Sequence, residues 1–517
     1  VAAVVGRDMF TDELRETLWQ FEQAKNFGSL IVPKLRDSAE TLRLVEVRDF
    51  GGDLLLKEVQ ERVLAVLRMA EAVSPKYHVV VANPPYMGRK SMNDALLGFA
   101  KDHYSSGSID LYAMFMLRSL SLAKTKGYMA MINMQSWMFL SSFEELRTKI
   151  VYDGAILSMA HLGAKAFDTI GGEVVSTTAF IIQHSPHPAE QGTYIRLLDG
   201  RSEKEKSEML LRSIENPEIS YRYTSRMGDF LDIPTAPIAY WFSEKVFRVF
   251  REYPSLNEAA PTKQGLATGD NDHFLRQWAE VEFGRIAYDC QSSQETILRS
   301  ERWFPCNKGG EFRKWFGNNY FVVNWENAGE RIKDLFGDNG RLRSRPQNES
   351  FYFKPGLTWS AISSGGLSMR LSPKGYMFET KGAMCFPSEA DMLPALAFLN
   401  SPVVSSLLQA LSPTLDFHEG PVGRLPFQSV KSTINLAVGA VEIARADWDA
   451  YETSWDFTTL PLLQPDHRAE TLEDSYAALR THWQGMTDEM QRLEEENNRV
   501  FIDAYGLQDE LTPEVPI

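Results

Sequence analysis

Cysteine is scarce in this chain, with three among 517 residues. Cys290, Cys306 and Cys385 are widely spaced and form no pair or cluster. Zinc sites need several thiol or imidazole ligands at short spacing, and secreted disulfide-stabilised domains are dense in cysteine. The sequence therefore favours neither a zinc site nor a disulfide framework, and a reducing cytoplasm is expected.

Long apolar runs are also missing. No apolar stretch reaches the roughly 18 residues that a membrane-spanning helix requires, and no signal-peptide pattern opens the sequence. Hydrophobic residues make up 44% of the chain and charged residues 24%, which is typical of a soluble globular protein. We expect two or three domains, a cytoplasmic location and no membrane partner.

Positive charge is in short supply, because the net charge is −15. That balance disfavours a nucleic-acid partner unless the acidic residues are segregated. Residues 481–517 hold nine acidic residues against two arginines, and the run Glu494–Glu496 is expected to be a solvated helical face. Between residues 299 and 316, basic and aromatic residues alternate instead: Arg299, Arg302, Trp303, Phe304, Lys308, Phe312, Arg313, Lys314, Trp315 and Phe316. This stretch predicts either a surface that follows a phosphate backbone or a solvated loop over an aromatic core.

The most informative stretch is an apolar, β-rich run over residues 79–82 that stops at Asn83-Pro84-Pro85-Tyr86. An exocyclic base amine is a poor nucleophile, because its lone pair is delocalised into the ring. Asn83 supplies a side-chain carbonyl and Pro84 a backbone carbonyl, and both can accept hydrogen bonds from such an amine. Tyr86 offers a flat face for a base rotated out of a duplex. The alternative is an ordinary turn after a strand.

Strands and helices alternate after this motif. Helices are expected from Ser108 to about Leu122 and over residues 143–150, and strands over residues 126–132, 155–157 and 178–182. That order predicts an α/β domain with a parallel sheet, whose ligands bind at the carboxyl ends of the strands. Asn83 follows such a strand.

These motifs together resemble the amino-methyltransferases that modify adenine N6 in DNA. Four further stretches, residues 25–30, 264–274, 303–310 and 396–401, are similar to single-chain restriction-modification methyltransferases, and most of all to the adenine-specific methyltransferases of BREX phage-defence systems. The resemblance implies a Rossmann-like methyltransferase sheet, S-adenosylmethionine as methyl donor, double-stranded DNA as substrate, host self-marking as the role and other phage-defence proteins as candidate partners.

The same resemblance assigns site residues. It gives Asn83, Pro84, Pro85 and Tyr86 to catalysis, with Tyr86 stacking on the flipped base. Phe167, in the loop of residues 166–172, is implied as the second aromatic against that base. The alternative for Phe167 is a place in the core beside its apolar neighbours.

One feature of that family is missing from the chain. Its members need a glycine-rich turn after the first strand, where the backbone approaches the methionine moiety, and an acidic residue after the second strand for the ribose hydroxyls. Neither pattern precedes Asn83, since Gly28, Gly51 and Gly52 lack the spacing. We expect an enzyme truncated inside its cofactor domain, which binds the cofactor weakly or not at all. The alternative is a rearranged enzyme, but no suitable glycine-rich turn follows downstream.

Composition shifts divide the chain into three parts. Residues 1–190 are expected to form a partial methyltransferase domain with an N-terminally truncated sheet, residues 191–428 an α+β target-recognition domain, and residues 429–517 a helical region. Reading the edges of bases in a groove requires polar side chains. By resemblance and chemistry, the DNA-binding candidates are Asp270, Asn271, Arg276, Lys308, Arg313, Lys314, Ser363 and Ser364.

Three functions remain open. The first is site-specific methyl transfer to adenine N6 by direct attack of the amine, with no covalent intermediate and no essential cysteine. The second is a relative that methylates RNA or a protein amide, since Asn-Pro-Pro serves those amines as well. The third is a non-catalytic DNA-recognition fragment without the cofactor site.

Overall fold

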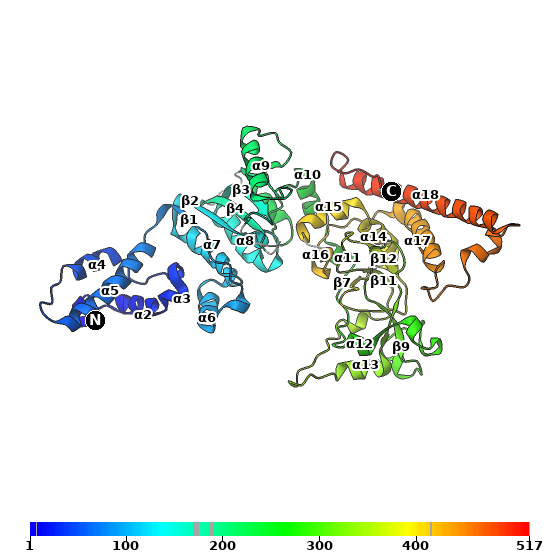
Figure 1. Cartoon of the computed structure of the whole chain (residues 1–517), viewed down its shortest axis with the longest axis horizontal. Helices are drawn as coiled ribbons and strands as arrows, with labels where there is room; N and C mark the ends of the chain where they lie inside the picture. Colours follow the sequence, from blue (N-terminus) through cyan, green and yellow to red (C-terminus); the bar gives the residue numbers. More distant parts are fainter. Residues whose placement is uncertain (7, 169–174, 186–190, 414–415, 516–517) are drawn as a thin grey trace. The chain divides into compact units, whose positions relative to one another are not determined.

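A computed structural model describes the whole chain except residues 7, 169–174, 186–190, 414–415 and 516–517. It divides into two compact units, Val1–Trp241 and Phe242–Ile517 (Figure 1). The boundary predicted near residue 190 lies inside the first unit, and the structure places the change of unit at residues 241 and 242 instead.

The first unit begins with a group of helices around a small apolar core. Asp37 and Asp53 cap two of these helices, because their carboxylates accept hydrogen bonds from backbone nitrogens of the first turn. Leu14, Val45 and Leu67 are buried where the helices meet. The helices are α1 (Ala2–Val5), α2 (Asp12–Gln20), α3 (Ala24–Phe27), α4 (Ser38–Glu46) and α5 (Leu54–Val73).

A six-stranded sheet follows, with the strand order β1-β2-β4-β3-β5-β6. Its strands are β1 (Tyr77–Ala82), β2 (Ala123–Met134), β3 (Ala155–Gly163), β4 (Thr177–Gln183), β5 (Gln191–Arg196) and β6 (Arg222–Arg226). β1 pairs with β2 in parallel, as the alternation predicted, and β3 pairs in parallel with β5, which lies beyond the predicted domain. β4 and β6 run antiparallel to their neighbours, so the sheet is mixed and the prediction of a parallel sheet was wrong for β4.

Helices cover the sheet unequally. The helices of this region are α6 (Asp94–His103), α7 (Leu111–Leu122), α8 (Glu144–Asp153) and α9 (Glu203–Glu215). α7 packs on β1 and β2, and on one face of the sheet Met129, Met131 and Phe180 are buried.

The opposite face of the sheet is apolar and partly uncovered. Along it, Val81 lies beside Ala130, and Ala130 lies beside Ile181. Val81 is 74% exposed and Ile181 39%. We call this surface the open face.

The second unit contains two small sheets, ordered β13-β9-β10-β8 and β12-β11-β14-β7. Its strands are β7 (Thr262–Lys263), β8 (Leu275–Gln277), β9 (Trp303–Asn307), β10 (Phe321–Asn324), β11 (Gly356–Trp359), β12 (Met369–Ser372), β13 (Met377–Phe378) and β14 (Met384–Cys385). A core of large apolar side chains, among them Phe304, Trp325 and Phe378, joins these sheets to the loops between them.

The helices of the second unit gather mainly toward its carboxyl end. They are α10 (Glu244–Glu252), α11 (Leu256–Ala259), α12 (Asn271–Phe274), α13 (Glu326–Lys333), α14 (Met392–Leu399), α15 (Pro402–Leu411), α16 (Glu419–Gly423), α17 (Ile434–Asp449) and α18 (Leu472–Tyr505). α17 and α18 pack against each other and against α14 and α15, respectively. The helices expected after residue 428 are therefore present.

Among the described residues, no single helix has the length and apolar character to cross a bilayer, although the segments Glu389–Leu399 and Pro402–Leu411, bent by 78°, reach that length and apolar character as a pair.

Candidate active site and nucleic-acid interface

The Asn83-Pro84-Pro85-Tyr86 turn lies at the carboxyl end of β1, where the sequence predicted it. Asn83 is exposed, Pro84 is buried and Tyr86 is half-buried. Within the described residues, neither the side chain of Asn83 nor the carbonyl of Pro84 takes part in a hydrogen bond. Two oxygen acceptors thus remain available for a ligand at the edge of the sheet where parallel α/β folds bind ligands.

Asp110 anchors the backbone just after this turn. One oxygen of its carboxylate accepts hydrogen bonds from the backbone nitrogens of Met87, at 3.0 Å, and Tyr112, at 3.3 Å. The backbone nitrogen of Leu111 donates to the carbonyl of Met87 at 3.0 Å. Burial raises the pKa of Asp110, and the backbone donors oppose that rise. The N-terminus of α7 and the motif loop therefore form one connected structure.

Tyr86 is oriented by a second tyrosine. The rings of Tyr86 and Tyr112 lie at 86°, with centroids 6.1 Å apart. The hydroxyl groups of Tyr112 and Ser136 form a hydrogen bond of 2.8 Å. Burial raises the pKa of both tyrosines, so both rings are neutral at physiological pH. Sequence reasoning missed Ser136, although its place shortly after the strand predicted over residues 126–132 was a usable signal.

Phe167 follows β3, another strand that ends at the same edge of the sheet as β1. Its side chain is half-buried. No ring contact between Phe167 and Tyr86 occurs in the described part of the chain, and residues 169–172 of the predicted loop lie outside it. The pairing of these two rings stays a prediction.

His161 forms a buried junction near the ends of β2 and β3. Its Nε2 lies 2.8 Å from Oε1 of Gln135, and its Nδ1 lies 2.8 Å from the Tyr240 hydroxyl. Burial, together with the nearby charges of Arg196 and Lys206, lowers the pKa of His161 to about 3. A neutral imidazole then donates from Nε2 and accepts at Nδ1. His161 is thus a structural residue rather than an acid–base catalyst.

The open face forms a hollow of about 910 Å³ that reaches Asn83. Among the described residues, its lining is almost wholly apolar and includes Val81, Ile132 and Ile181; Arg222 is the one charged residue that they contribute, and none of them contributes a carboxylate. S-adenosylmethionine needs an acidic side chain for its ribose hydroxyls. The residues of this hollow therefore do not fit the polar part of that cofactor. Among the described residues, no group of three or more histidine, cysteine or acidic side chains could hold a metal ion.

Arg313 and Lys314 pair with the carboxyl-terminal helices. Nη2 of Arg313 lies 2.5 Å from Oδ2 of Asp447 on α17, and Nζ of Lys314 lies 2.9 Å from Oε2 of Glu494 on α18. The indole nitrogen of Trp315 donates to the other oxygen of Glu494 at 2.6 Å. Glu494 is only 8% exposed, so its prediction as a solvated residue was wrong. The positive charges of Arg313 and Lys314 are thus paired with carboxylates of the same chain.

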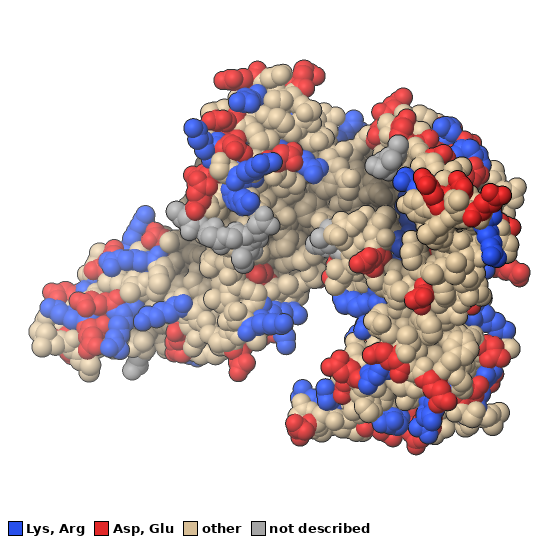
Figure 2. All heavy atoms as spheres, turned by 45° about the vertical axis from the view of Figure 1, so that its right-hand side comes forward, with Lys and Arg blue, Asp and Glu red and all other residues tan. Residues whose placement is uncertain are grey.

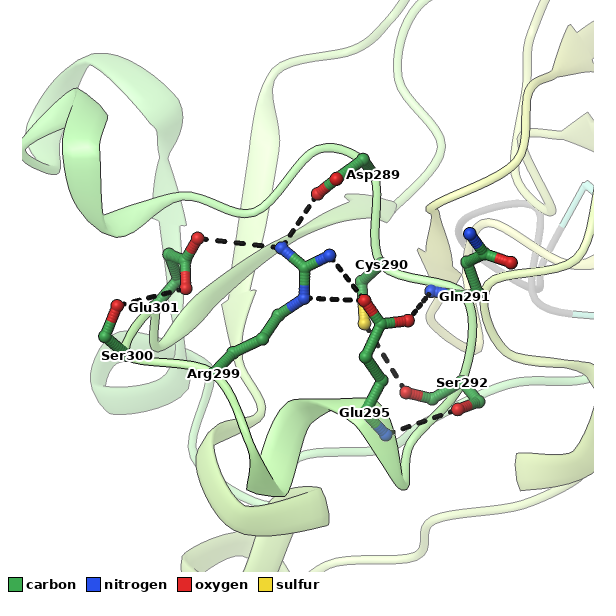
Figure 3. A network of polar contacts seen from close by, with 8 residues as sticks. All are labelled: Asp289, Cys290, Gln291, Ser292, Glu295, Arg299, Ser300 and Glu301. Atoms are coloured by element: carbon green, nitrogen blue, oxygen red, sulfur yellow. Dashed lines mark hydrogen bonds and ion pairs between the residues drawn. The ribbon is translucent and has the colours of Figure 1, made fainter.

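Arg299 is also neutralised within the protein (Figure 3). Its guanidinium lies 2.8 Å from Asp289, 2.5 Å from Glu295 and 3.6 Å from Glu301. Arg299 holds the pKa of Asp289 and of Glu295 below the usual range. Arg302 pairs with Glu326.

The aromatic residues of the same stretch are largely interior. Phe304, Trp315 and Phe316 are buried. The lower lobe in Figure 2, which holds α12 and α13, shows basic and acidic residues interspersed. For residues 299–316, these features favour a loop that covers an aromatic core and whose basic residues are ion-paired. They do not favour a continuous surface that follows a phosphate backbone.

The other DNA-binding candidates lie at several places in the second unit. Asp270 caps α12, and Asn271 accepts a hydrogen bond from Thr268. Arg276 donates to backbone carbonyls. Their part in DNA binding stays a prediction.

Lys308 and the two serines complete the candidate set. The ammonium of Lys308 lies 4.5 Å from the centroid of the Phe321 ring. Ser363 is buried, whereas Ser364 is exposed. For these three residues too, DNA binding stays a prediction.

Comparison with known proteins gives one family match. The Eco57I restriction-modification methylase family model matches residues 20–167, the part that holds the Asn83 turn. The chain is 40% identical to an adenine-specific methyltransferase PglX of Lacticaseibacillus casei (strain Zhang), over 98% of this chain and 43% of that protein. It is 36% identical to an adenine-specific methyltransferase BrxX of Escherichia coli O9:H4 (strain HS), over 96% of this chain and 40% of that protein. The chain thus spans less than half the length of these relatives.

Solved structures also align with the chain. One is the Type IIL restriction-modification enzyme MmeI in complex with DNA, with a TM-score of 0.46, 11% identity, and coverage of 99% of this chain and 76% of that one. Another is a nuclease-deletion mutant of the Type ISP enzyme LlaGI in complex with a DNA substrate mimic, with a TM-score of 0.44, 12% identity, and coverage of 84% and 40%.

Proposed function

We propose that this chain, a homologue of the adenine-specific methyltransferases PglX and BrxX, is the part of an adenine-N6 DNA methyltransferase that carries the amine-binding motif and the DNA-recognition region. One observation carries the proposal. The side-chain carbonyl of Asn83 and the backbone carbonyl of Pro84 lie side by side in the sequence at a strand end, and neither is used by the described protein.

The chemistry follows from these two acceptors. An adenine N6 amine has two N–H groups, and hydrogen bonds from them to Asn83 and Pro84 return electron density to the nitrogen. S-adenosylmethionine, when held by the complete protein, would supply a methyl group whose bond to sulfur breaks as the bond to N6 forms, and the proton that the amine gives up would pass to solvent. Tyr86, held by Tyr112, offers a ring on which the flipped base stacks. No covalent intermediate is needed, in agreement with three buried cysteines.

S-adenosylmethionine is the methyl donor that the proposed reaction requires. Because the described residues that line the hollow beside Asn83 include no carboxylate, the cofactor-binding residues are proposed to lie in sequence of the longer protein outside this chain. The relatives have such additional length. The apolar open face is a suitable surface for that part of the protein to cover.

Double-stranded DNA is the proposed substrate and host self-marking in phage defence the proposed role. Both rest on the names of the two relatives and on the residue types of the turn. Other phage-defence proteins are proposed partners. The second unit is proposed to recognise the target site.

The test replaces Asn83 by alanine in the protein expressed from its complete gene. Methylated adenines are then mapped by sequencing genomic DNA from cells with the wild type or the variant. We expect methylation to fall by at least 100-fold, since the lost acceptor acts on the reacting amine. Asn435→Ala is the matched control, because Asn435 is exposed on α17 and has no hydrogen-bond partner among the described residues.

Three results would contradict the proposal. Unchanged adenine methylation in Asn83→Ala would remove the catalytic role from the turn. Absence of methylated adenine in wild-type cells, together with DNA binding, would favour a non-catalytic DNA-recognition fragment. Methylation of RNA or of a protein amide would favour a methyltransferase that acts on those substrates instead.

A further inference from the structure

A β-hairpin in the second unit has no part in the features described so far. Its two arms, residues 335–337 and 341–345, follow α13 and are joined by an isolated β-bridge between Phe336 and Leu342 (Figure 1). The backbone nitrogen of Arg343 donates to the carbonyl of Leu335, and that of Gly337 donates to the carbonyl of Arg341, each at 2.8 Å. Arg345 and Ala267 exchange backbone hydrogen bonds, which fix the base of the hairpin.

The turn of the hairpin is built by its sequence, Gly337-Asp338-Asn339-Gly340. Gly340 has a φ of +69°, a conformation that favours glycine, and its nitrogen donates to the carbonyl of Gly337. The side chain of Asn339 accepts a hydrogen bond from the nitrogen of Arg341. Sequence reasoning missed this turn, although a Gly-Asp-Asn-Gly run between apolar residues is a hairpin signal.

One face of the hairpin exposes apolar side chains. Phe336 and Leu342 are directly opposite each other and are 59% and 47% exposed. Side chains of such a cross-strand pair lie on the same face. A pair of large apolar side chains in water at a projecting tip is unfavourable unless a partner covers it.

Arginines occupy the other face of the second strand. Arg341, Arg343 and Arg345 are exposed and alternate with Leu342 and the buried Ser344. Because side chains alternate along a strand, the three arginines are spaced by roughly 6.6 Å on one side. They form a row of positive charge that sequence reasoning did not identify.

These arginines differ from those of residues 299–314 in their charge partners. None of the three lies within 4.0 Å of a carboxylate in the described residues, whereas Arg299, Arg302 and Arg313 all do. Their polar contacts are with uncharged groups: Arg343 donates to the carbonyl of Gly269, and Arg345 donates to the side-chain oxygen of Gln264. Hydrogen bonds to uncharged groups therefore hold Arg343 and Arg345 in place without neutralising their positive charge.

Amide side chains extend the polar surface at the base of the hairpin. The side-chain oxygen of Gln264 also accepts a hydrogen bond from Gln347, at 3.2 Å, and Asn348 donates to the Gln264 carbonyl at 2.8 Å. Arginine, asparagine and glutamine are the residue types that read guanine and adenine in the major groove.

We propose that the hairpin of residues 335–345 is a β-ribbon that enters the major groove of the target DNA. The major groove is about 12 Å wide and admits a two-stranded ribbon, and strands in such a ribbon are about 4.8 Å apart. Arg341 and Arg343 contact phosphates or guanine edges, and Phe336 and Leu342 contact thymine methyl groups. This inference rests on the proposed DNA methyltransferase function and specifies the surface that reads the DNA.

The first experiment measures binding of the full chain to a 30-base-pair duplex of mixed sequence as salt is raised from 50 to 200 mM. The test variant is Arg341→Ala/Arg343→Ala. Loss of two phosphate contacts lowers the salt slope by about 1.8, since each contributes about 0.9. The control is Arg492→Ala/Arg499→Ala, which removes the same charge from α18, where both arginines pair with glutamates.

The outcomes separate this inference from the proposed function. A lower slope in the hairpin variant alone supports the ribbon. If the wild type binds and both variants lose equally, the hairpin has no special role and the inference is overturned. If the wild type shows no salt-dependent binding, the proposed DNA function itself fails.

A second experiment identifies the groove. A duplex carrying the methylated motif found by genomic sequencing is treated with dimethyl sulfate, which reacts with guanine N7 in the major groove and adenine N3 in the minor groove. Wild-type protein should protect guanine N7, and the hairpin variant should lose that protection. Protection of adenine N3 alone, or N7 protection that persists in the variant, would overturn the groove assignment.

Discussion

Asp110 and Met87 join the start of α7 to the turn after β1: a carboxylate oxygen of Asp110 accepts a hydrogen bond from the Met87 nitrogen at 3.0 Å. The same oxygen caps α7 through Tyr112. A helix that begins at a half-buried carboxylate thus also fixes the loop that presents Asn83 and Tyr86. Neither element can shift without breaking a hydrogen bond of the other.

Replacing Asp110 by alanine should destabilise the protein by about 1 to 2 kcal/mol, because a lost N-cap costs about 1 kcal/mol and the Met87 nitrogen also loses its partner. Urea unfolding measures this change. Asp110→Asn keeps an acceptor oxygen and should restore most of the stability. In the whole enzyme, Asp110→Ala should lower kcat more than it raises KM, and an unchanged kcat would deny Asp110 its positioning role.

His161 should make the first unit sensitive to acid. Its pKa is lowered to about 3 in the folded state, against about 6.5 in the unfolded chain. The unfolded state therefore binds a proton first as pH falls, and stability is lost from pH 6.5 downward at up to about 1.4 kcal/mol per pH unit. Unfolding of the wild type and of His161→Gln, compared between pH 7 and 5, tests this. Equal slopes for the two proteins would contradict it.

Lys314→Ala should destabilise the second unit by about 1 to 3 kcal/mol, because Glu494 would remain charged and nearly buried without its cation. Glu494→Gln in the same background should recover part of the loss. Lys374→Ala, at an exposed lysine without an ion pair among the described residues, should change stability by less than about 0.5 kcal/mol.

The same Lys314 variant tests the predicted DNA contact at this position. A salt slope of DNA binding equal to that of the wild type would assign Lys314 to the helix interface alone. A slope lowered by about 0.9 would restore its predicted phosphate contact.

Cofactor titration should separate this chain from its longer protein. Isothermal titration of S-adenosylmethionine into residues 1–517 should show weak binding or none, since no described residue of the hollow at Asn83 supplies a carboxylate. The protein from the complete gene should bind. Equal binding by both would mean that a cofactor site lies within this chain, and the rearranged-enzyme alternative would return.

Local pattern was enough to predict the elements around Asn83. The strands that became β1, β2, β3 and β4, and the helix that became α7, have continuous apolar cores and clear turn signals. Local pattern did not reveal whether neighbouring strands pair in parallel or antiparallel. β4 is a buried apolar run whether it lies parallel or antiparallel, so the sequence could not distinguish the two.

The domain boundary illustrates a second limit. The proline-containing stretch near residue 186 predicted a domain boundary. However, β5 and β6, which follow it in sequence, belong to the same sheet as β1 to β4. Turn residues indicate where the chain bends, whereas sheet membership depends on partners distant in sequence.

The prediction of a DNA-binding surface was limited because the ion-pair partners of its basic residues are distant in sequence. Arg313 and Lys314 are close to aromatic residues in sequence, yet their carboxylate partners lie more than 130 residues later. No local pattern reveals such partners. The arginines of the hairpin could have been identified from the sequence, because alternation of arginine with other residues after a Gly-Asp-Asn-Gly turn is a local signal.

The exposed edge of β1 has a consequence for handling the protein. No strand of the described residues pairs with its outer side, and Val79 and Val81 on this strand are 56% and 74% exposed. Such an edge is a template for pairing with a second copy of the same strand. The isolated chain should therefore self-associate as its concentration rises, and a lysine in place of Val81 should keep it dispersed.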